Sequence, residues 1–133
     1  MFLNLLNKNE SQNFLELSHE AMMINGVVKE SEEAVYATFQ KETGLLEYEL
    51  QGKSLDSIVT AFRASTKKVR KAVVIEIAGI LGADEEIDEN EKNWILKLGT
   101  DLGLRESEVK KMVRWVQDFN DLLAEGYEYI HKK

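Results

Sequence analysis

An internal repeat constrains the fold of this chain more than any other feature of its sequence. Residues 24–50, INGVVKESEEAVYATFQKETGLLEYEL, align without a gap over residues 83–109, ADEEIDENEKNWILKLGTDLGLRESEV, at a shift of 59 positions. The coinciding pairs include Asn25 with Asp84, Val28 with Ile87, Glu32 with Glu91, Gly44 with Gly103 and Leu45 with Leu104. Neither unit can bury its apolar face alone, so we expect two pseudo-symmetric halves, about residues 10–50 and 69–109, to share one core.

The composition and the apolar periodicity both predict an all-α fold. The chain has 133 residues and no proline, the residue that most strongly interrupts helices, which indicates a single helical domain over residues 1–133. Apolar residues recur every three to four positions between glycines, as in amphipathic helices. About seven helices are expected: residues 10–25, 30–43, a short piece at 45–50, one after Ser54, 66–82, one ending before Gly103, and a long last helix.

Charge and cysteine content exclude several classes of function. The net charge of −7 disfavours binding to nucleic acid, since the one dense basic run, residues 67–71, reads as a solvated helix face. Without cysteine there can be no disulfide, thiolate metal site or thiol catalysis. The first eleven residues lack the features of a signal peptide, and no apolar run reaches the ~20 residues that span a bilayer. We therefore expect a cytoplasmic protein.

The acidic stretch ADEEIDENE, residues 83–91, has two interpretations. Asp88 stands where the N-cap of a helix is expected, and Glu91 follows three residues later, the spacing of a capping box. Carboxylates in the first turn of a helix also favour its dipole. On this interpretation the stretch is a capped, solvated helix start.

The second interpretation is a site for a divalent cation, Ca²⁺ or Mg²⁺. Asp84, Glu86 and Asp88 alternate as the first ligands of an EF-hand loop do, but Glu89 replaces the required glycine and Ile95 the twelfth-position glutamate. The stretch is therefore no EF-hand, and a partly hydrated site remains. Its candidate ligands are Asp84, Glu86, Asp88 and Glu91.

The sequence ADEEIDENE followed by WILKLGTDLGL resembles the TerB-like family, which includes tellurite-resistance TerB proteins and the N-terminal domain of DjlA co-chaperones. The resemblance covers roughly residues 14–118, in both halves. It implies a compact helical fold of two related halves and a non-enzymatic binding role in stress response, through divalent cations at acidic turns and through protein partners. By position, Asp84 and Glu91 match the motif of the second turn, and Asn25 and Glu32 match that of the first.

Two departures from the family pattern concern the proposed cation sites. Glu85 replaces the glycine of the motif in the second half, and Asn25 replaces an aspartate in the first. Asn25 removes one charge from the first turn, and Lys29 occupies its cap position. We therefore place the expected cation site in the second half.

A di-iron carboxylate enzyme is an alternative of another class. Helical di-iron proteins use two Glu-x-x-His motifs and two further glutamates. This chain has Glu16 with His19 and Glu128 with His131, and Glu76 lies within the apolar run VVIEIAGIL. The periodicity, however, places Glu76 at the boundary of the buried stripe.

The remaining apolar residues suggest a third hypothesis, a metal-free interaction domain that binds its partner through an apolar groove. Trp94 and Trp115 stand at helical spacing within apolar faces, and we expect both to pack in the core. Apolar side chains near the two termini are candidates for a contact between two copies. They are Phe2, Leu3, Leu5, Leu6, Tyr127 and Tyr129.

Overall fold

A computed structural model of the chain describes residues 1–26, 28–83 and 87–132, and within these ranges every regular element is helical. The all-α prediction is therefore confirmed. The elements are a short 3₁₀ helix η1 (Leu3–Leu5) and the α-helices α1 (Lys8–Met22), α2 (Glu30–Thr43), α3 (Leu55–Arg63), α4 (Lys67–Leu81), α5 (Glu89–Asp101) and α6 (Glu106–His131).

Short polar side chains begin most of these helices. Each satisfies a backbone N–H that the first helical turn leaves without a partner. The side chains of Asn7, Ser54, Thr66 and Asp88 accept from the third residue of α1, α3, α4 and α5, respectively. Left-handed glycines follow α2 and α5, with φ of 72° at Gly44 and 85° at Gly103.

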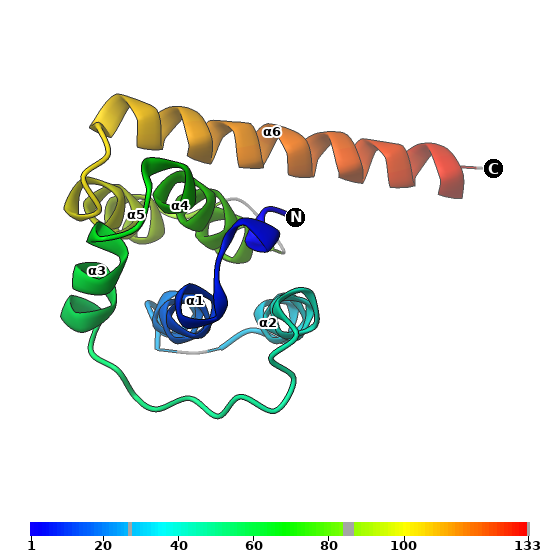
Figure 1. Cartoon of the computed structure of the whole chain (residues 1–133). Helices are drawn as coiled ribbons and strands as arrows, with labels where there is room; N and C mark the ends of the chain where they lie inside the picture. The colour runs from blue at the N-terminus through cyan, green and yellow to red at the C-terminus, as the bar shows by residue number, and fades with distance from the viewer. Residues whose placement is uncertain (27, 84–86, 133) are drawn as a thin grey trace.

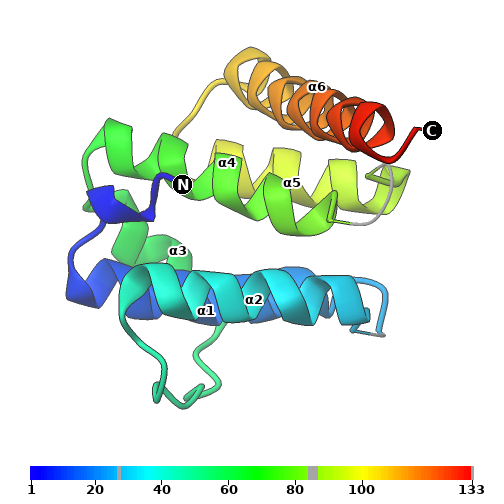
Figure 2. The same ribbon diagram turned by 90° about the vertical axis from the view of Figure 1, so that its right-hand side faces the viewer.

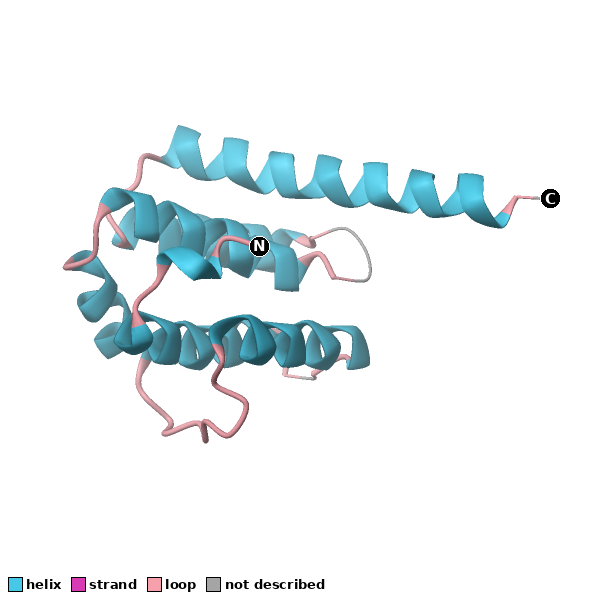
Figure 3. Ribbon diagram, turned by 45° about the vertical axis from the view of Figure 1, so that its right-hand side comes forward, coloured by secondary structure: helices cyan, strands magenta, loops and turns pink. Residues whose placement is uncertain are grey.

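The helices are arranged in three layers (Figure 2). α1 and α2 form one outer layer, α4 and α5 the middle layer, and α6 lies across the other side. α3 closes one end of the molecule (Figure 1), where it packs against α1. Figure 3 shows that α6 continues well past the layer beneath it.

The core lies between the layers, and α4 is its centre. α4 contacts α1, α2, α5 and α6, and nine of its fifteen residues are buried. Phe14 of α1 and Ile77 of α4 are fully enclosed, and the ring of Phe14 meets that of Phe39 edge-on at 5.0 Å. The apolar run VVIEIAGIL of α4 thus lies at the centre of the core.

The predicted short helix over residues 45–50 is wrong, since residues 45–54 form an irregular loop between α2 and α3. The reason is the buried carboxylate of Glu16 on α1. It accepts hydrogen bonds from the Tyr48 hydroxyl at 2.6 Å and from the backbone N–H groups of Gln51 at 2.8 Å and Lys53 at 3.2 Å. The bond from Tyr48 ties the predicted segment to α1, and the bonds from Gln51 and Lys53 tie the chain that follows it.

Two expectations about individual burial are also corrected. Glu76 is buried, because the first residues of the chain cover it and Phe2 donates its N–H to the carboxylate at 2.9 Å. Trp115 is 46% exposed rather than part of the core, because the first residues of the chain and Ile75 of α4 border it around a hollow of about 320 Å³. Trp94 is half-buried against the core.

Among the residues described, no helix combines the length and the apolar character needed to cross a membrane.

Candidate functional site

The second acidic turn begins α5 with a complete capping box. Asp88 Oδ1 accepts the N–H of Glu91 at 2.8 Å, and Glu91 Oε1 accepts the N–H of Asp88 at 3.0 Å. The preceding Ile87 is buried in the core and fixes the entry of the chain into the helix. The capping interpretation of the spacing is therefore confirmed for this pair of residues.

The first turn lies against the second. The Asn25 side-chain amide donates to Asp88 Oδ2 at 3.1 Å, although the two residues are 63 positions apart. The start of α2 has the equivalent glutamate, Glu32, whose carboxylate accepts the N–H of Lys29 at 3.1 Å. Sequence reasoning did not predict this contact between turns, because nothing local to either turn signals it.

The meeting of the two turns raises the pKa of one carboxyl group. Both glutamates of the turns are buried, with exposed fractions of 4% for Glu32 and 3% for Glu91. Burial and the neighbouring charges of Asp88 and Glu32 raise the pKa of Glu91, against the lowering effect of the Asp88 N–H and of Lys29. Asp88 has a lowered pKa instead, chiefly because it accepts the Glu91 N–H.

Only part of the predicted cation site can be located. Asp84 and Glu86 lie outside the described residues, whereas Asp88 and Glu91 lie together at the start of α5, bonded to each other. Within the described ranges, no three or more acidic, histidine or cysteine side chains are grouped so that they could hold a metal ion. The cation site therefore stays a prediction.

The residues of the di-iron hypothesis are not brought together. His19 lies on α1 in the lower layer, and His131 lies in the last turn of α6, which extends away from the body (Figure 1). Glu16 binds the 45–54 loop and Glu76 binds the backbone of Phe2. Each buried carboxylate thus holds a neighbouring segment of the chain.

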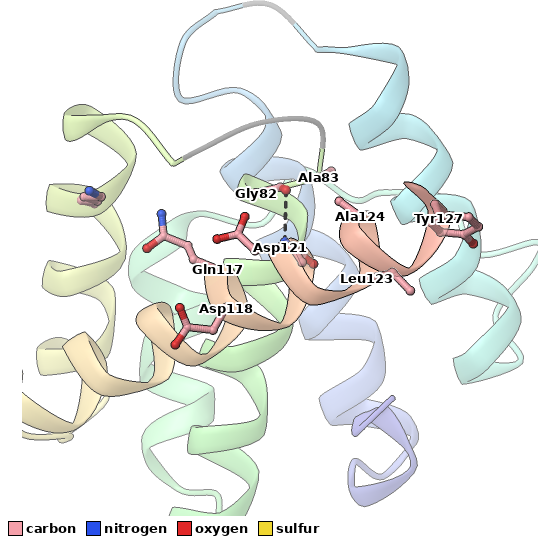
Figure 4. A pocket seen from close by; sticks show the side chains of 10 residues that line it. Gly82, Ala83, Gln117, Asp118, Asp121, Leu123, Ala124 and Tyr127 are labelled. Carbon is pink, nitrogen blue, oxygen red and sulfur yellow. Dashed lines mark hydrogen bonds between the residues drawn. The ribbon is translucent and has the colours of Figure 1, made fainter. Parts of the chain in front are cut away.

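A groove that sequence reasoning missed lies beside the second acidic turn. It encloses about 630 Å³ between the second half of α6, the end of α4 and Lys92 of α5 (Figure 4). The Asn120 side-chain amide donates to the carbonyl of Gly82 at 3.2 Å and marks where α6 leaves the body. The groove is lined by Gly82, Ala83, Lys92, Gln117, Asp118, Asn120, Asp121, Leu123, Ala124 and Tyr127.

The length of the last helix is the sequence feature from which this groove could have been predicted. At 1.5 Å per residue, the 26 residues of α6 extend for about 39 Å, against about 22 Å for the 15 residues of α4. The last part of α6, which exceeds the length of α4, projects from the body (Figure 3). Its apolar face is consequently exposed, with Leu123 at 50% and Tyr127 at 57%.

Comparison with protein-family models, with curated proteins and with solved structures found no match to this chain.

Proposed function

We propose that this chain is a non-enzymatic binding module of the TerB-like kind, whose groove beside α6 takes a helical segment of a protein partner. One observation carries the proposal: α6 continues past the body and leaves Leu123, Ala124 and Tyr127 exposed along a groove. Amphipathic helices are commonly bound in such apolar grooves. The volume of about 630 Å³ lies within the ~300–1,000 Å³ of typical ligand sites.

The charges around the groove favour a basic partner. Asp118 and Asp121 lie among the lining residues, and Lys92 is the one cation among those that the structure describes. The net charge of the chain is −7. A segment with one apolar face and flanking lysines or arginines would therefore complement both the Leu123–Tyr127 stripe and its acidic edge.

The helix boundaries support the two-repeat interpretation behind the TerB-like assignment. A shift of 59 residues places α1 on α4 from end to end, because 8 + 59 is 67 and 22 + 59 is 81. The same shift places the start of α2 on that of α5 and Gly44 on Gly103, both left-handed. The stress-related role that the resemblance implies is part of this proposal.

The groove can be tested with a synthetic basic amphipathic helical peptide made of leucine, alanine and lysine. We expect it to bind the protein, and the same peptide with glutamate in place of lysine to bind much more weakly. Ala124→Arg should abolish binding, because it adds bulk and a like charge within the groove. Ala37→Arg, on the exposed side of α2, is the matched control. Fluorescence anisotropy that shows equal binding by the Ala124→Arg and Ala37→Arg variants would refute the groove.

The acidic turn supports a second proposal, a weak divalent-cation site formed by Asp84, Glu86, Asp88 and Glu91. The observation in its favour is the raised pKa of the buried Glu91 beside other carboxylates, since a bound cation would offset that repulsion. Titration calorimetry of chelator-treated protein with Ca²⁺ and Mg²⁺ tests it. Asp88→Asn is the informative variant, because asparagine keeps the cap and removes the charge. An absence of heat with the unmodified chain would exclude the site.

A further inference from the structure

α6 has a second apolar seam that the body of the molecule covers only in part, since Met112 packs against the core while Trp115 and Leu122 are exposed. The first seam, Val109, Val113 and Val116, is buried, and α6 packs on α4 and α5. The second, here called the outer seam, alternates spacings of three and four residues, the heptad spacing of helices that pack side by side. It consists of Met112, Trp115, Phe119 and Leu122 and continues to Gly126 and Tyr129. At 3.6 residues per turn, the two seams are roughly 110° apart around the helix.

The outer seam forms one continuous apolar patch with its surroundings. Trp115 stacks on Phe119 at 5.5 Å between ring centroids, and the ring of Phe2 lies 6.3 Å from the indole on its other side. A hollow of about 320 Å³ runs between Phe2, Trp115 and Ile75 of α4. Leu122 is 67% exposed. Contiguous exposed patches of this kind mark interaction sites on soluble proteins.

The charges that flank the outer seam are segregated along the helix. Lys111, Asp118 and Glu125 succeed each other at seven-residue intervals and so share one edge of the seam. Arg114 precedes Asp121 in the same way on the adjacent row. Within the residues described, none of these five side chains forms an ion pair. The basic first half and the acidic second half are thus available to an external partner.

This segregation distinguishes the two orientations in which identical helices can pair. A parallel pair of α6 helices would place the row of Lys111, Asp118 and Glu125 opposite the row of Val116, Leu123 and Ile130, where it would find no charged partner. An antiparallel pair places Lys111 beside Glu125 of the second copy, at two symmetric positions. The heptad spacing agrees with this register, because it layers Met112 on Leu122 and Trp115 on Phe119 across the pair.

We propose that a second copy of this chain covers the outer seam, and that the two α6 helices pair antiparallel about a twofold axis between Trp115 and Phe119. The interface is isologous, so it closes with two chains. Its apolar residues lie on a different face of α6 from Leu123, Ala124 and Tyr127, and Asp118 borders both the outer seam and the groove. A test can therefore refute the groove proposal and leave the dimer proposal intact, or refute the dimer proposal and leave the groove proposal intact.

Sedimentation velocity over a range of concentrations tests the dimer. We expect a species of about 30 kDa, twice the 15.2 kDa of one chain, that dissociates on dilution. Phe119→Glu should yield only monomer, whereas Leu46→Glu, at an apolar residue that is 64% exposed on the loop after α2, should not change the distribution. Monomer alone at millimolar concentration of the unmodified chain would overturn the proposal.

Charge reversal keeps the test valid where Phe119→Glu fails to fold. Lys111→Glu should weaken the dimer by about tenfold, because it creates two repulsive pairs in place of two attractive ones. Adding Glu125→Lys in the same chain should restore the dimer, since both members of each pair are then exchanged. A double variant as weak as Lys111→Glu would contradict the antiparallel register.

Introduced cysteines report the orientation directly, because the chain has none of its own. In the proposed register Asp118 lies beside its own copy, so Asp118→Cys should form a disulfide-linked dimer. A mixture of Lys111→Cys and Glu125→Cys chains should form mixed dimers. Linkage of Lys111→Cys to itself that is as efficient as that of Asp118→Cys would contradict the antiparallel register and overturn the proposal.

Discussion

The α1–α2 pair and the α4–α5 pair begin and end alike, yet the chain takes a different course after each. Both pairs end in a left-handed glycine followed by a buried or half-buried leucine, Gly44–Leu45 and Gly103–Leu104. After the first comes the irregular segment 45–54, and after the second comes α6. The local signals that end a helix therefore do not determine what the next segment becomes.

Two positions, Glu16 and Gly99, account for the different course of the chain after each pair. Glu16 on α1 presents a buried carboxylate, which requires N–H and O–H partners and so holds an irregular loop. Its counterpart 59 positions on is Ile75, which is apolar and offers no acceptor to a backbone N–H. Gly99 on α5 lies against Val109 of α6, whereas its counterpart on α2 is the longer Gln40. Gly99 thus lets α6 pack closely on the second pair, whereas the buried carboxylate of Glu16 binds an irregular loop on the first pair.

The largest expected effect comes from removing the carboxylate that the first pair uses. Glu16→Ala leaves the Gln51 and Lys53 N–H groups and the Tyr48 hydroxyl without their acceptor, and we expect a loss of about 3 kcal/mol in the free energy of unfolding. Urea denaturation followed by circular dichroism measures it. Glu47→Ala, on the exposed surface of the same loop, is the control. A loss below about 1 kcal/mol would mean that the loop does not depend on Glu16.

The contribution of Gly99, the small residue of the second pair, to stability can be tested in the same way. A Cβ on Gly99 would lie 2.3 Å from Val109 Cγ2, so Gly99→Ala must push α5 and α6 apart. We expect a loss of about 2 kcal/mol in unfolding free energy.

Gly79 provides the matched control for this substitution. It also lies within a helix, but a Cβ there meets no atom within 4 Å. Gly79→Ala should leave stability unchanged or raise it by up to about 1 kcal/mol, because alanine is the better helix former. Thermal melts in which both substitutions act alike would show that the α5–α6 approach is not tight at Gly99.

The helix boundaries could be predicted from sequence because their signals are local. Apolar periodicity and glycine placed a helix over residues 30–43, and α2 occupies Glu30–Thr43. The cap at Asp88 and its partner Glu91 could likewise be read from a spacing of three residues. Each of these features depends on neighbours within one or two helical turns.

Burial that depends on distant segments could not be predicted in this way. Glu76 is covered by Phe2, 74 positions away, and Trp115 is exposed although Phe2 and Ile75 border it. Periodicity identifies an apolar face without telling whether a second element covers it. For the candidate site the sequence identified the capping residues, but not the groove along α6 or the contact of Asn25 with Asp88.

A smaller effect is expected at the cap where the two pairs meet. Asp88→Ala removes the acceptor of the Glu91 N–H and should lower the unfolding free energy by about 1 kcal/mol. Asp88→Asn should be close to neutral, because the asparagine oxygen caps equally well. Chemical denaturation of both variants measures the difference. Equal losses would show that the negative charge, and not the hydrogen bond, is what matters at this turn.

The smallest expected effect is a difference in the sign of the pH dependence that two buried glutamates, Glu16 of the first pair and Glu91 of the second, give to stability. Hydrogen bonds from Tyr48, Gln51 and Lys53 outweigh burial and lower the pKa of Glu16, so its contribution is present at neutral pH and declines as pH falls through its folded pKa. The pKa of Glu91 is raised, chiefly by burial, so its contribution is present in acid and declines as pH rises from its unfolded towards its folded pKa.

Glutamine substitutions separate these opposite dependences, because they keep an acceptor oxygen and remove the titration. Relative to the unmodified chain, Glu91→Gln should gain stability as pH rises above the ordinary glutamate pKa of 4.5, and Glu16→Gln should lose stability as pH rises towards 4.5 from below. Urea midpoints at three pH values measure both, and Glu47→Gln reports the general effect of removing one carboxylate. A trend for Glu91→Gln that matches that of Glu47→Gln would mean that the meeting of the acidic turns leaves Glu91 as well solvated as a surface carboxylate, and would remove the physical support for a cation at that turn.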